Sequence, residues 1–318
     1  MKKPAKYPAP SYLDPRDKRM VQIIKSASGA EPKAVNILGI PYDGAVLGRK
    51  GAAGGPSAVR ESMGSFSNYN VELGLGLEGA RVFDLGDMVL GSPDITSTHQ
   101  AIEEEVGRDI APSSLLVTLG GDNSISLPAL RACGKKSKAL GLIVIDSHFD
   151  LRGMIGGKPN SGSSYGLALE AVETLDPGRV VEIGIHGFLN SKSYADKAEQ
   201  LGVKVITAEE VRKGGALSAA RDAYAFASAG ADLVYLSVDL DAVDISQVSG
   251  VSAPSVGGIS GGELSTMVYE IAKNDRVKAA DLVELAPSLD PTGRSQRVAA
   301  TVLMYLIAGF ASRGSSRQ

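Results

Sequence analysis

Residues 140–152 read LGLIVIDSHFDLR, and this stretch decides how the rest of the chain is interpreted. It begins with an unbroken apolar run rich in β-branched residues, which is typical of a strand buried on both faces of a parallel sheet. It ends in Asp146, His148 and Asp150. If the chain stays extended there, these side chains point the same way and converge where the strand leaves the sheet. We expect a metal site at this point; a strand end that merely carries solvated polar residues is the alternative.

The same alternation of short apolar runs and helical segments continues along the chain. Strands are predicted at 34–40, 81–85, 114–119, 140–145, 180–185, 203–207, 232–238 and 280–285. Helices are predicted from about 56 onward and at 97–108, 126–133, 216–229, 263–272 and 295–310. This order predicts one α/β domain over 34–318, with a doubly wound, mostly parallel sheet and helices on both faces. Residues 1–33 are polar and predict an N-terminal arm with one short helix at 15–28.

Composition narrows the class of protein. The chain has 318 residues, of which 43% are hydrophobic and 22% charged, as in an ordinary soluble globular protein. The net charge of −3 gives no sign of a nucleic-acid partner. An apolar run long enough to span a membrane is absent, so we expect no membrane partner and a cytoplasmic location. The single cysteine, Cys133, cannot form an internal disulfide.

Acidic residues also follow the strand predicted at 232–238. Asp239 and Asp241 lie two residues apart and therefore on one side of an extended chain. Two carboxylates leaving a buried strand repel each other unless a cation lies between them. The strand predicted at 280–285 brings Glu284 to its end. By contrast, His99 falls in a polar helix, where we expect it at the surface.

The acidic residues at these strand ends constrain the chemistry. Four carboxylates carry about four negative charges, which two divalent cations would balance; they are Asp146, Asp150, Asp239 and Asp241. One imidazole among several oxygen ligands suits Mn²⁺ better than structural zinc. Two such ions sharing one water would lower its pKa toward neutrality. Because Glu284 adds further negative charge, the fitting substrate has a cationic carbon centre, an amidinium or guanidinium, and the reaction is hydrolysis of a C–N bond.

Four motifs carry a resemblance to a known family. They are GGDNS at 120–124, DSHFD at 146–150, SVDLDAVD at 237–244 and DLVELAP at 281–287. In order and spacing they resemble the signatures of the ureohydrolase superfamily, which contains arginases, agmatinases and formimidoylglutamases. The resemblance implies a three-layer α/β/α, arginase-like fold, a binuclear Mn²⁺ centre, and a homo-oligomer, commonly a trimer or hexamer.

The resemblance also implies roles for individual residues. The metal ligands would be Asn123, Asp146, His148, Asp150, Asp239 and Asp241, with Asp146 and Asp239 bridging the two ions. Asp150 would also shuttle a proton to the departing amine, and Glu284 would hold the substrate nitrogens. Asn123 departs from the pattern, because the family usually has a histidine there, and an amide oxygen is a weaker ligand. Alternatively, Asn123 only hydrogen-bonds its loop and the site holds one metal.

The loops around these motifs favour one branch of the superfamily. Ser161 and Gly162 stand where the family has an HG pair, and this loop, GIHGFLNSKSY at 184–194 and GVSAP at 250–254 resemble formimidoylglutamases more than arginases or agmatinases. Arg152 is expected to pair with a substrate carboxylate, an ion pair with a structural acid being the alternative. Hydrogen bonds beside it are expected from Asn160, Ser161, Asn190 and Tyr194. The predicted reaction is hydrolysis of N-formimidoyl-L-glutamate to glutamate and formamide.

Two other functions stay open at this point. The first is an amidinohydrolase that releases urea from agmatine, a guanidino acid or an N-hydroxyguanidine. The second is a metal-deficient, non-catalytic family member that has lost one metal ion because Asn123 replaces the usual ligand. Four clustered aspartates without cations would destabilise the folded state at neutral pH, which argues against the second.

Overall fold

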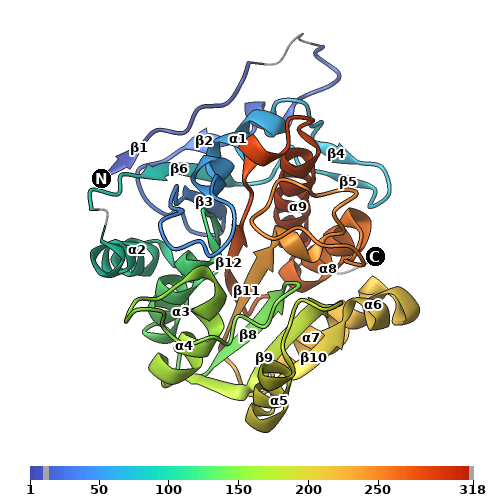
Figure 1. The fold of residues 1–318 in the computed structure, drawn as a ribbon. Coiled ribbons are helices and arrows are strands. Elements are labelled where there is room, and N and C mark those ends of the chain that lie inside the picture. Colours follow the sequence, from blue (N-terminus) through green and yellow to red (C-terminus); the bar gives the residue numbers. More distant parts are fainter. Residues whose placement is uncertain (10–13, 93, 315–318) are drawn as a thin grey trace.

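A computed structural model describes residues 1–9, 14–92 and 94–314, so residues 10–13 of the predicted arm, and 93 and 315–318 of the predicted domain, lie outside the described residues. One large sheet runs through the molecule (Figure 1). Its strands are β1 (Lys2–Lys3), β2 (Lys25–Ser26), β3 (Val35–Gly39), β6 (Val82–Met88), β7 (Leu115–Leu119), β8 (Leu140–Ile145), β9 (Leu175–Ile185), β10 (Lys204–Thr207), β11 (Leu233–Asp239) and β12 (Val277–Val283). A separate hairpin joins β4 (Tyr69–Asn70) to β5 (Leu75–Gly76).

The strand order explains why the sheet is doubly wound. It runs β1-β6-β3-β7-β12-β11-β8-β9-β10, with β2 also paired to β6. All pairs in this sheet are parallel except β1 with β6. Parallel neighbours need crossover connections, and helices provide most of them.

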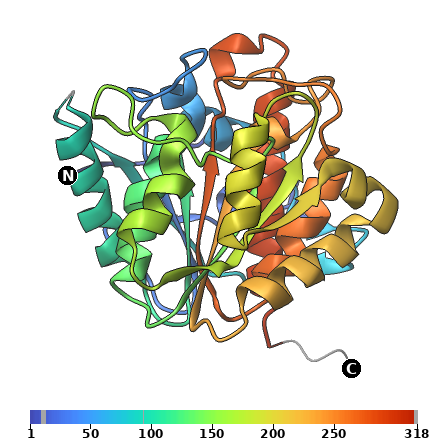
Figure 2. The ribbon, with the colours of Figure 1, turned by 60° about the horizontal axis from the view of Figure 1, so that its bottom comes forward.

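Helices cover both faces of the sheet (Figure 2). They are α1 (Gly55–Met63), α2 (Ile95–Asp109), α3 (Ser126–Gly134), α4 (Ser164–Ala171), α5 (Lys192–Leu201), α6 (Ala208–Gly214), α7 (Ala216–Ala227), α8 (Gly261–Ala272) and α9 (Arg294–Ala311). Buried residues of α2 to α5 pack on one face and those of α1 and α6 to α9 on the other. The predicted three-layer α/β/α fold is confirmed. No helix among the described residues is long and apolar enough to cross a membrane.

The N-terminal segment is attached to the sheet. Lys2 and Lys3 pair with β6, and the Tyr7 hydroxyl donates to Asp84 Oδ2 at 2.5 Å. The helix predicted at 15–28 is wrong, because the chain forms only a 3₁₀ turn at Met20–Gln22 and then joins the sheet as β2. Met20 is buried while the charged residues around it are not, so this segment lacks the continuous apolar face of a helix. The boundary at residue 33 stays a prediction.

His99 corrects another expectation. It lies on α2, but its side chain is buried, with Nε2 3.4 Å from Ser124 Oγ and its ring edge-on to Tyr42. The helix therefore turns this face toward the loop that follows β7. The prediction of a surface histidine failed because the helix looked polar on all sides in the sequence.

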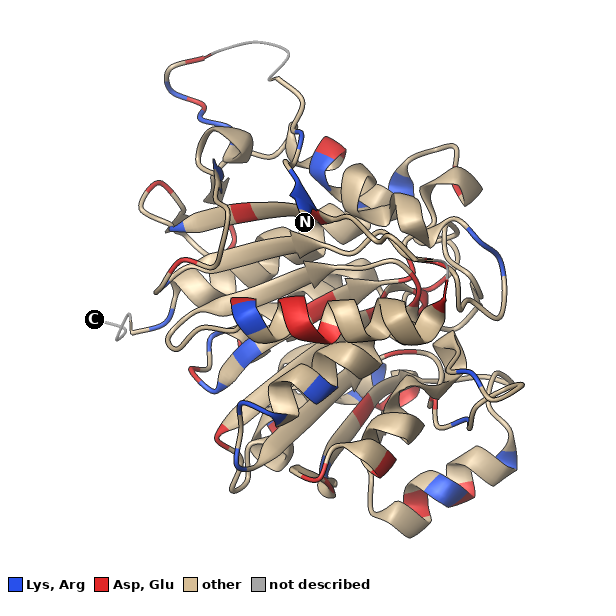
Figure 3. Cartoon of the chain, turned by 90° about the vertical axis from the view of Figure 1, so that its left-hand side faces the viewer, with Lys and Arg blue, Asp and Glu red and all other residues tan. Residues whose placement is uncertain are grey.

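The topology places the four motifs together. Each follows one of the four adjacent central strands, in the spatial order β7, β12, β11 and β8. The register pairs Leu119 with Leu282, Val238 with Leu282 and Val238 with Ile145, so the carboxyl ends of these strands are level. Acidic segments gather in the loops at one end of the sheet in Figure 3. Carboxyl ends of parallel strands are where α/β proteins commonly bind ligands.

Candidate metal centre

Tight turns follow two of the central strands and aim their aspartates. Asp146 Oδ1 accepts the backbone N–H of His148 at 2.6 Å, and Asp239 Oδ1 accepts that of Asp241 at 2.8 Å. Each turn engages one oxygen of its own carboxylate, as Asp does in turns. The side chains at 146 and 148 thus converge because the chain turns, whereas the sequence argument assumed an extended strand end; β8 stops at Ile145.

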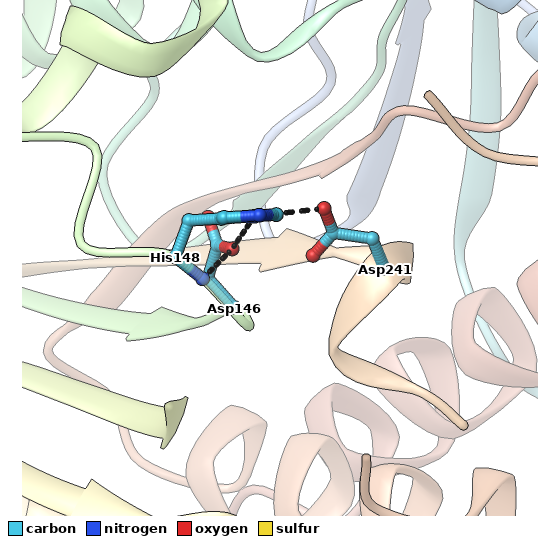
Figure 4. Close-up of side chains that lie close together, drawn as sticks. All are labelled: Asp146, His148 and Asp241. Atoms are coloured by element: carbon cyan, nitrogen blue, oxygen red, sulfur yellow. Dashed lines mark hydrogen bonds and ion pairs between the residues drawn. The ribbon is translucent and has the colours of Figure 1, made fainter. Parts of the chain in front are cut away.

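Three side chains form the centre of the site (Figure 4). His148 Nδ1 lies 3.0 Å from Asp241 Oδ2 and 3.5 Å from Asp146 Oδ1. One ligand atom from each residue lies within 4.8 Å of the others, which is a separation that one metal ion can span. The Ser147 hydroxyl donates to Asp241 Oδ1 at 2.7 Å and braces that carboxylate.

The electrostatics of the site favour positive charge. Burial first, and then neighbouring carboxylates, raise the pKa values of Asp146 and Asp239 well above their usual range. Burial also raises the pKa of Asp150 to about 6. At His148 burial opposes the charge, but Asp241 and Asp146 outweigh it and raise the pKa to about 12. At Asp241 burial opposes ionisation, but His148 lowers the pKa, so the imidazolium already compensates part of the negative charge, and a divalent cation would relieve the repulsion among the other carboxylates.

Unpartnered oxygens test whether a metal fits. Asp146 Oδ2 and Glu284 Oε2 are buried and have no hydrogen-bond partner among the described residues. An orphaned buried carboxylate oxygen is costly unless it meets a cation. Because Asp146 Oδ2 belongs to the acidic cluster, the residues present fit a metal bound by hard oxygen ligands and one imidazole.

Asn123 follows the sharp turn at the end of β7. A side chain at Gly121 would come within 1.5 Å of the Tyr42 carbonyl, so this turn requires glycine. The backbone N–H of Asn123 donates to Glu284 Oε1 at 2.8 Å, and its side chain lies 2.5 Å from Asp150 Oδ2. Asn123 therefore lies between Asp150 and Glu284, and its role as a metal ligand stays a prediction.

Asp150 and Glu284 share an unusual backbone conformation. Their φ angles are +48° and +67°, in the left-handed region that residues other than glycine rarely adopt. Lys33 and Ser113 are the other non-glycine examples among the described residues. Such conformations cost about 1–3 kcal/mol each and concentrate at functional sites. The two residues predicted to be catalytic are thus held at some cost in stability.

A cavity of about 250 Å³ joins these groups. Its lining includes Asn123, His148, Asp150, Arg152, Ser161, Asp239, Asp241 and Glu284. Larger cavities of about 590 and 770 Å³ open elsewhere, but neither contains the acidic cluster. Chemistry rather than size therefore identifies the smaller cavity as the site, and its volume suits a small substrate.

The predicted substrate residues have different positions. Arg152 and Ser161 line the cavity, and the Arg152 guanidinium lies over the Tyr194 ring at 5.3 Å. The positive charge of Arg152 also opposes the burial that raises the pKa of Asp150, so both interpretations of Arg152, a substrate ligand and an ion pair with an acid of the protein, stay predictions. Asn160 is buried and caps the Ser161–Ser163 turn, and Asn190 donates to the Ser147 carbonyl and accepts from the Phe149 N–H. These two amides hold loops of the site rather than line its cavity.

Sequence reasoning missed a layer of hydroxyls behind Asn123. Tyr165 on α4, Ser126 on α3 and Ser237 on β11 are fully buried and hydrogen-bonded around the Asn123 side chain and Asp281. Asp281 and Ser237 belong to two of the quoted motifs. Asp281 lies three residues before Glu284, and Ser237 lies two residues before Asp239. These positions, close to the predicted site residues, were the signal that the sequence offered.

Comparisons with known proteins identify relatives of this chain. The model of the arginase family matches residues 33–309. Formimidoylglutamase of Halobacterium salinarum is 36% identical over 307 residues, which cover 94% of this chain and 96% of that protein. The crystal structure of formimidoylglutamase from Bacillus subtilis has a TM-score of 0.90 at 27% identity and covers 96% of this chain and 95% of that chain. Formiminoglutamase of Trypanosoma cruzi with Mn²⁺ has a TM-score of 0.85 at 29% identity, covering 93% and 99%.

The fold and the acidic centre define an α/β protein of the metal-dependent hydrolase type. The chain belongs to the arginase family. The resemblance stated from the four motifs is confirmed, and these three relatives share the name formimidoylglutamase or formiminoglutamase.

Proposed function

We propose that this protein is a Mn²⁺-dependent hydrolase that converts N-formimidoyl-L-glutamate and water to L-glutamate and formamide. The observation that carries the proposal is that Glu284 and Arg152 line the same small cavity as the acidic centre. Glu284 supplies negative charge for the amidinium of the substrate, and Arg152 supplies positive charge for its carboxylate. The formimidoylglutamase names of the relatives support the same substrate.

The metal centre would be held by the six predicted ligands, Asn123, Asp146, His148, Asp150, Asp239 and Asp241. When bound, Mn²⁺ would lower the pKa of water and so supply a nucleophile at neutral pH. Two ions per chain match the four aspartates in charge. The Asn123 amide makes one of the two sites the weaker.

The residues of the chain divide the remaining work. Glu284 holds the formimidoyl group as a cation, since its buried Oε2 has no other partner among the described residues. Water adds to the formimidoyl carbon, the bond from that carbon to the glutamate nitrogen breaks, and formamide forms. Asp150 passes a proton from the water to the departing amine, which becomes the amine of glutamate.

Arg152 is proposed to select the substrate. Its side chain is exposed, and Tyr194 supports the guanidinium from one side. A guanidinium can bind a carboxylate through two hydrogen bonds. Ser161 also lines the cavity, and its hydroxyl would donate a hydrogen bond to the substrate. Asn160 and Asn190 keep the loops that carry these residues in place.

A substrate panel tests the proposal. Protein loaded with Mn²⁺ is assayed for formamide from N-formimidoyl-L-glutamate and for urea from agmatine and from a guanidino acid. We expect turnover of the first substrate only. Arg152→Ala should raise KM for it about 10-fold or more, since a charged hydrogen bond contributes about 1.5–3 kcal/mol. Urea release without formamide release would instead establish the amidinohydrolase.

Metal content tests the centre separately. We expect two Mn²⁺ per chain after reloading, and tighter binding of the second ion in Asn123→His. One ion or none in the unmodified protein, restored to two by the histidine, would favour the metal-deficient alternative. We also expect a cytoplasmic homo-oligomer, a trimer or hexamer, which light scattering coupled to size-exclusion chromatography would test for assembly.

A further inference from the structure

The buried carboxylate of Asp281 lies at the centre of a closed hydrogen-bond network. Its Oδ1 accepts from Ser237 Oγ at 2.6 Å and from the Val238 N–H at 3.2 Å. Its Oδ2 accepts from Ser126 Oγ at 2.6 Å and from the Tyr235 hydroxyl at 2.7 Å. Four donors around one carboxylate satisfy it as an anion.

Two of these hydroxyls connect Asp281 to Asn123. Ser126 Oγ lies 2.9 Å from Asn123 Oδ1, the amide atom that faces away from the acidic site in the structure. On the other side, Ser237 Oγ lies 2.9 Å from the Tyr165 hydroxyl, which is 3.1 Å from the same amide atom. Asp281 therefore reaches one atom of Asn123 by two routes. All five side chains are at least 99% buried, so their hydrogen bonds must be satisfied within the protein.

A count of hydrogens fixes the direction of these bonds. Each hydroxyl has one hydrogen, and Ser126 and Ser237 give theirs to Asp281, because contacts of 2.6 Å are typical of a hydroxyl donating to a carboxylate. Tyr165 then donates to Ser237. The Ser126 and Tyr165 oxygens can then only accept hydrogen bonds from Asn123. The amide oxygen has no hydrogen to donate, whereas the amide nitrogen has two and can donate one to each of these hydroxyl oxygens.

We propose that Asp281 is a positioning residue that turns the Asn123 oxygen toward the metal site. The two orientations of the amide occupy the same space. In the structure the nitrogen points inward and donates to Asp150 Oδ2 at 2.5 Å and to the Ser161 carbonyl at 3.4 Å, which suits the site when no cation is near. With the oxygen inward, the nitrogen donates to Ser126 and Tyr165, and the oxygen is free to bind a cation. This inference rests on the proposed metal centre and explains how an asparagine can serve in it.

A purely structural role for Asp281 makes a different prediction. The network also ties β12 to β11 and α3, so its loss would lower the melting temperature of the metal-free protein. It would not by itself change how many Mn²⁺ ions bind or how tightly. Mn²⁺ affinity is therefore the readout that separates the two roles.

Asp281→Asn is the decisive variant. The amide introduced at position 281 has one donor end, and because the Val238 N–H needs an acceptor, that end faces Ser126 and Tyr235. Ser126 then gives its hydrogen to Asn123 and draws the Asn123 oxygen away from the site. We expect one of the two Mn²⁺ ions to bind at least about 10-fold more weakly, the size of effect that partners of metal ligands have. Electron paramagnetic resonance of free Mn²⁺ during a titration measures both affinities. Tyr235→Phe is the matched control, because it removes a donor to Asp281 that has no route to Asn123, and it should bind Mn²⁺ as the unmodified protein does.

Two further variants keep the test decisive if Asp281→Asn does not fold. Ser126→Ala and Tyr165→Phe each remove one acceptor for the Asn123 nitrogen, so each should weaken the same Mn²⁺ site. Unchanged Mn²⁺ affinity at both sites in Asp281→Asn, or in both of these variants, would overturn the inference and leave the proposed function intact. Fewer than two ions in the unmodified protein would overturn the metal centre and the inference together.

Discussion

Protonation of His99 should make this protein sensitive to mild acid. His99 is buried behind the GGDNS loop, beside Ser124 and Tyr42. Burial first, and then the charge of Arg131, lower its pKa from 6.5 to about 4. Between these two values the unfolded chain holds a proton on His99 that the folded chain does not. Stability therefore falls as the pH falls through this window.

The two pKa values give the size of the effect. At pH 7.5 the histidine is neutral in both states and contributes almost nothing to the pH dependence. A pH of 5 lies about 1.5 pH units below the pKa of the unfolded state, so proton binding by that state destabilises the fold by about 2 kcal/mol. His99→Gln, which can still hydrogen-bond Ser124, removes this contribution. The free energy of unfolding of each protein at pH 5 is compared with its own value at pH 7.5. A difference in stability that the substitution causes at both pH values therefore does not enter the comparison.

Urea unfolding of both proteins, freed of metal, at pH 7.5 and pH 5 measures the difference. The unmodified protein should lose about 2 kcal/mol more than His99→Gln between the two values. Proton NMR of the His99 ring should show it neutral at pH 5 in the folded state. Equal losses in the two proteins, or a ring already protonated at pH 6, would refute the reasoning.

Three other substitutions test separate parts of the structure. Glu284→Gln should lower kcat/KM for the proposed substrate about 100-fold, since a charged hydrogen bond of up to about 3 kcal/mol is lost, while Mn²⁺ stoichiometry by elemental analysis stays the same. Glu182 is fully buried with both oxygens unpartnered among the described residues, and burial followed by Asp146 and Asp150 raises its pKa well above the usual range. The folded state thus keeps a proton that the unfolded state loses as the pH rises, and this difference destabilises the fold. Glu182→Gln should therefore stabilise the metal-free protein at pH 8, by about 1.4 kcal/mol for each pH unit from the unfolded pKa up to the folded pKa or pH 8, whichever is lower. Equal urea midpoints would contradict this. Arg60 is buried against Asp84 at 2.8 Å, and Arg60→Met should cost about 3–5 kcal/mol in chemical denaturation because it leaves that carboxylate uncompensated.

The sheet could be predicted because its strands are apolar on both faces. The runs that became β7, β8 and β11 are fully buried, and such runs have few other interpretations. Helices α4, α5 and α6 were missed for different reasons. The sequence of α4 begins in a Ser- and Gly-rich loop, and α5 buries only Ala198 completely. The start of α6 could have been predicted from the sequence, because Thr207 and Glu210 form a capping box.

The clustering of acidic residues at the strand ends was predicted, but its geometry was not. Acidic residues after buried strands indicate a centre that needs positive charge, and Asp146, His148 and Asp241 do meet. The turns that bring them together depend on backbone hydrogen bonds that a spacing rule cannot supply. The hydroxyls around Asp281 were invisible for another reason, since serine and tyrosine in a strand or helix look the same whether they face solvent or an amide.

Selection for thermal stability alone would work against the two left-handed residues of the site. Glycine at position 150 or 284 would adopt the same backbone angle at no steric penalty and would remove a carboxyl group from the crowded acidic site. A screen that rewards heat resistance would therefore enrich variants that fold better and lack the two carboxyl groups proposed to act in catalysis. Any programme to make this protein more robust has to hold these two positions fixed and look for its gains in the distant helices.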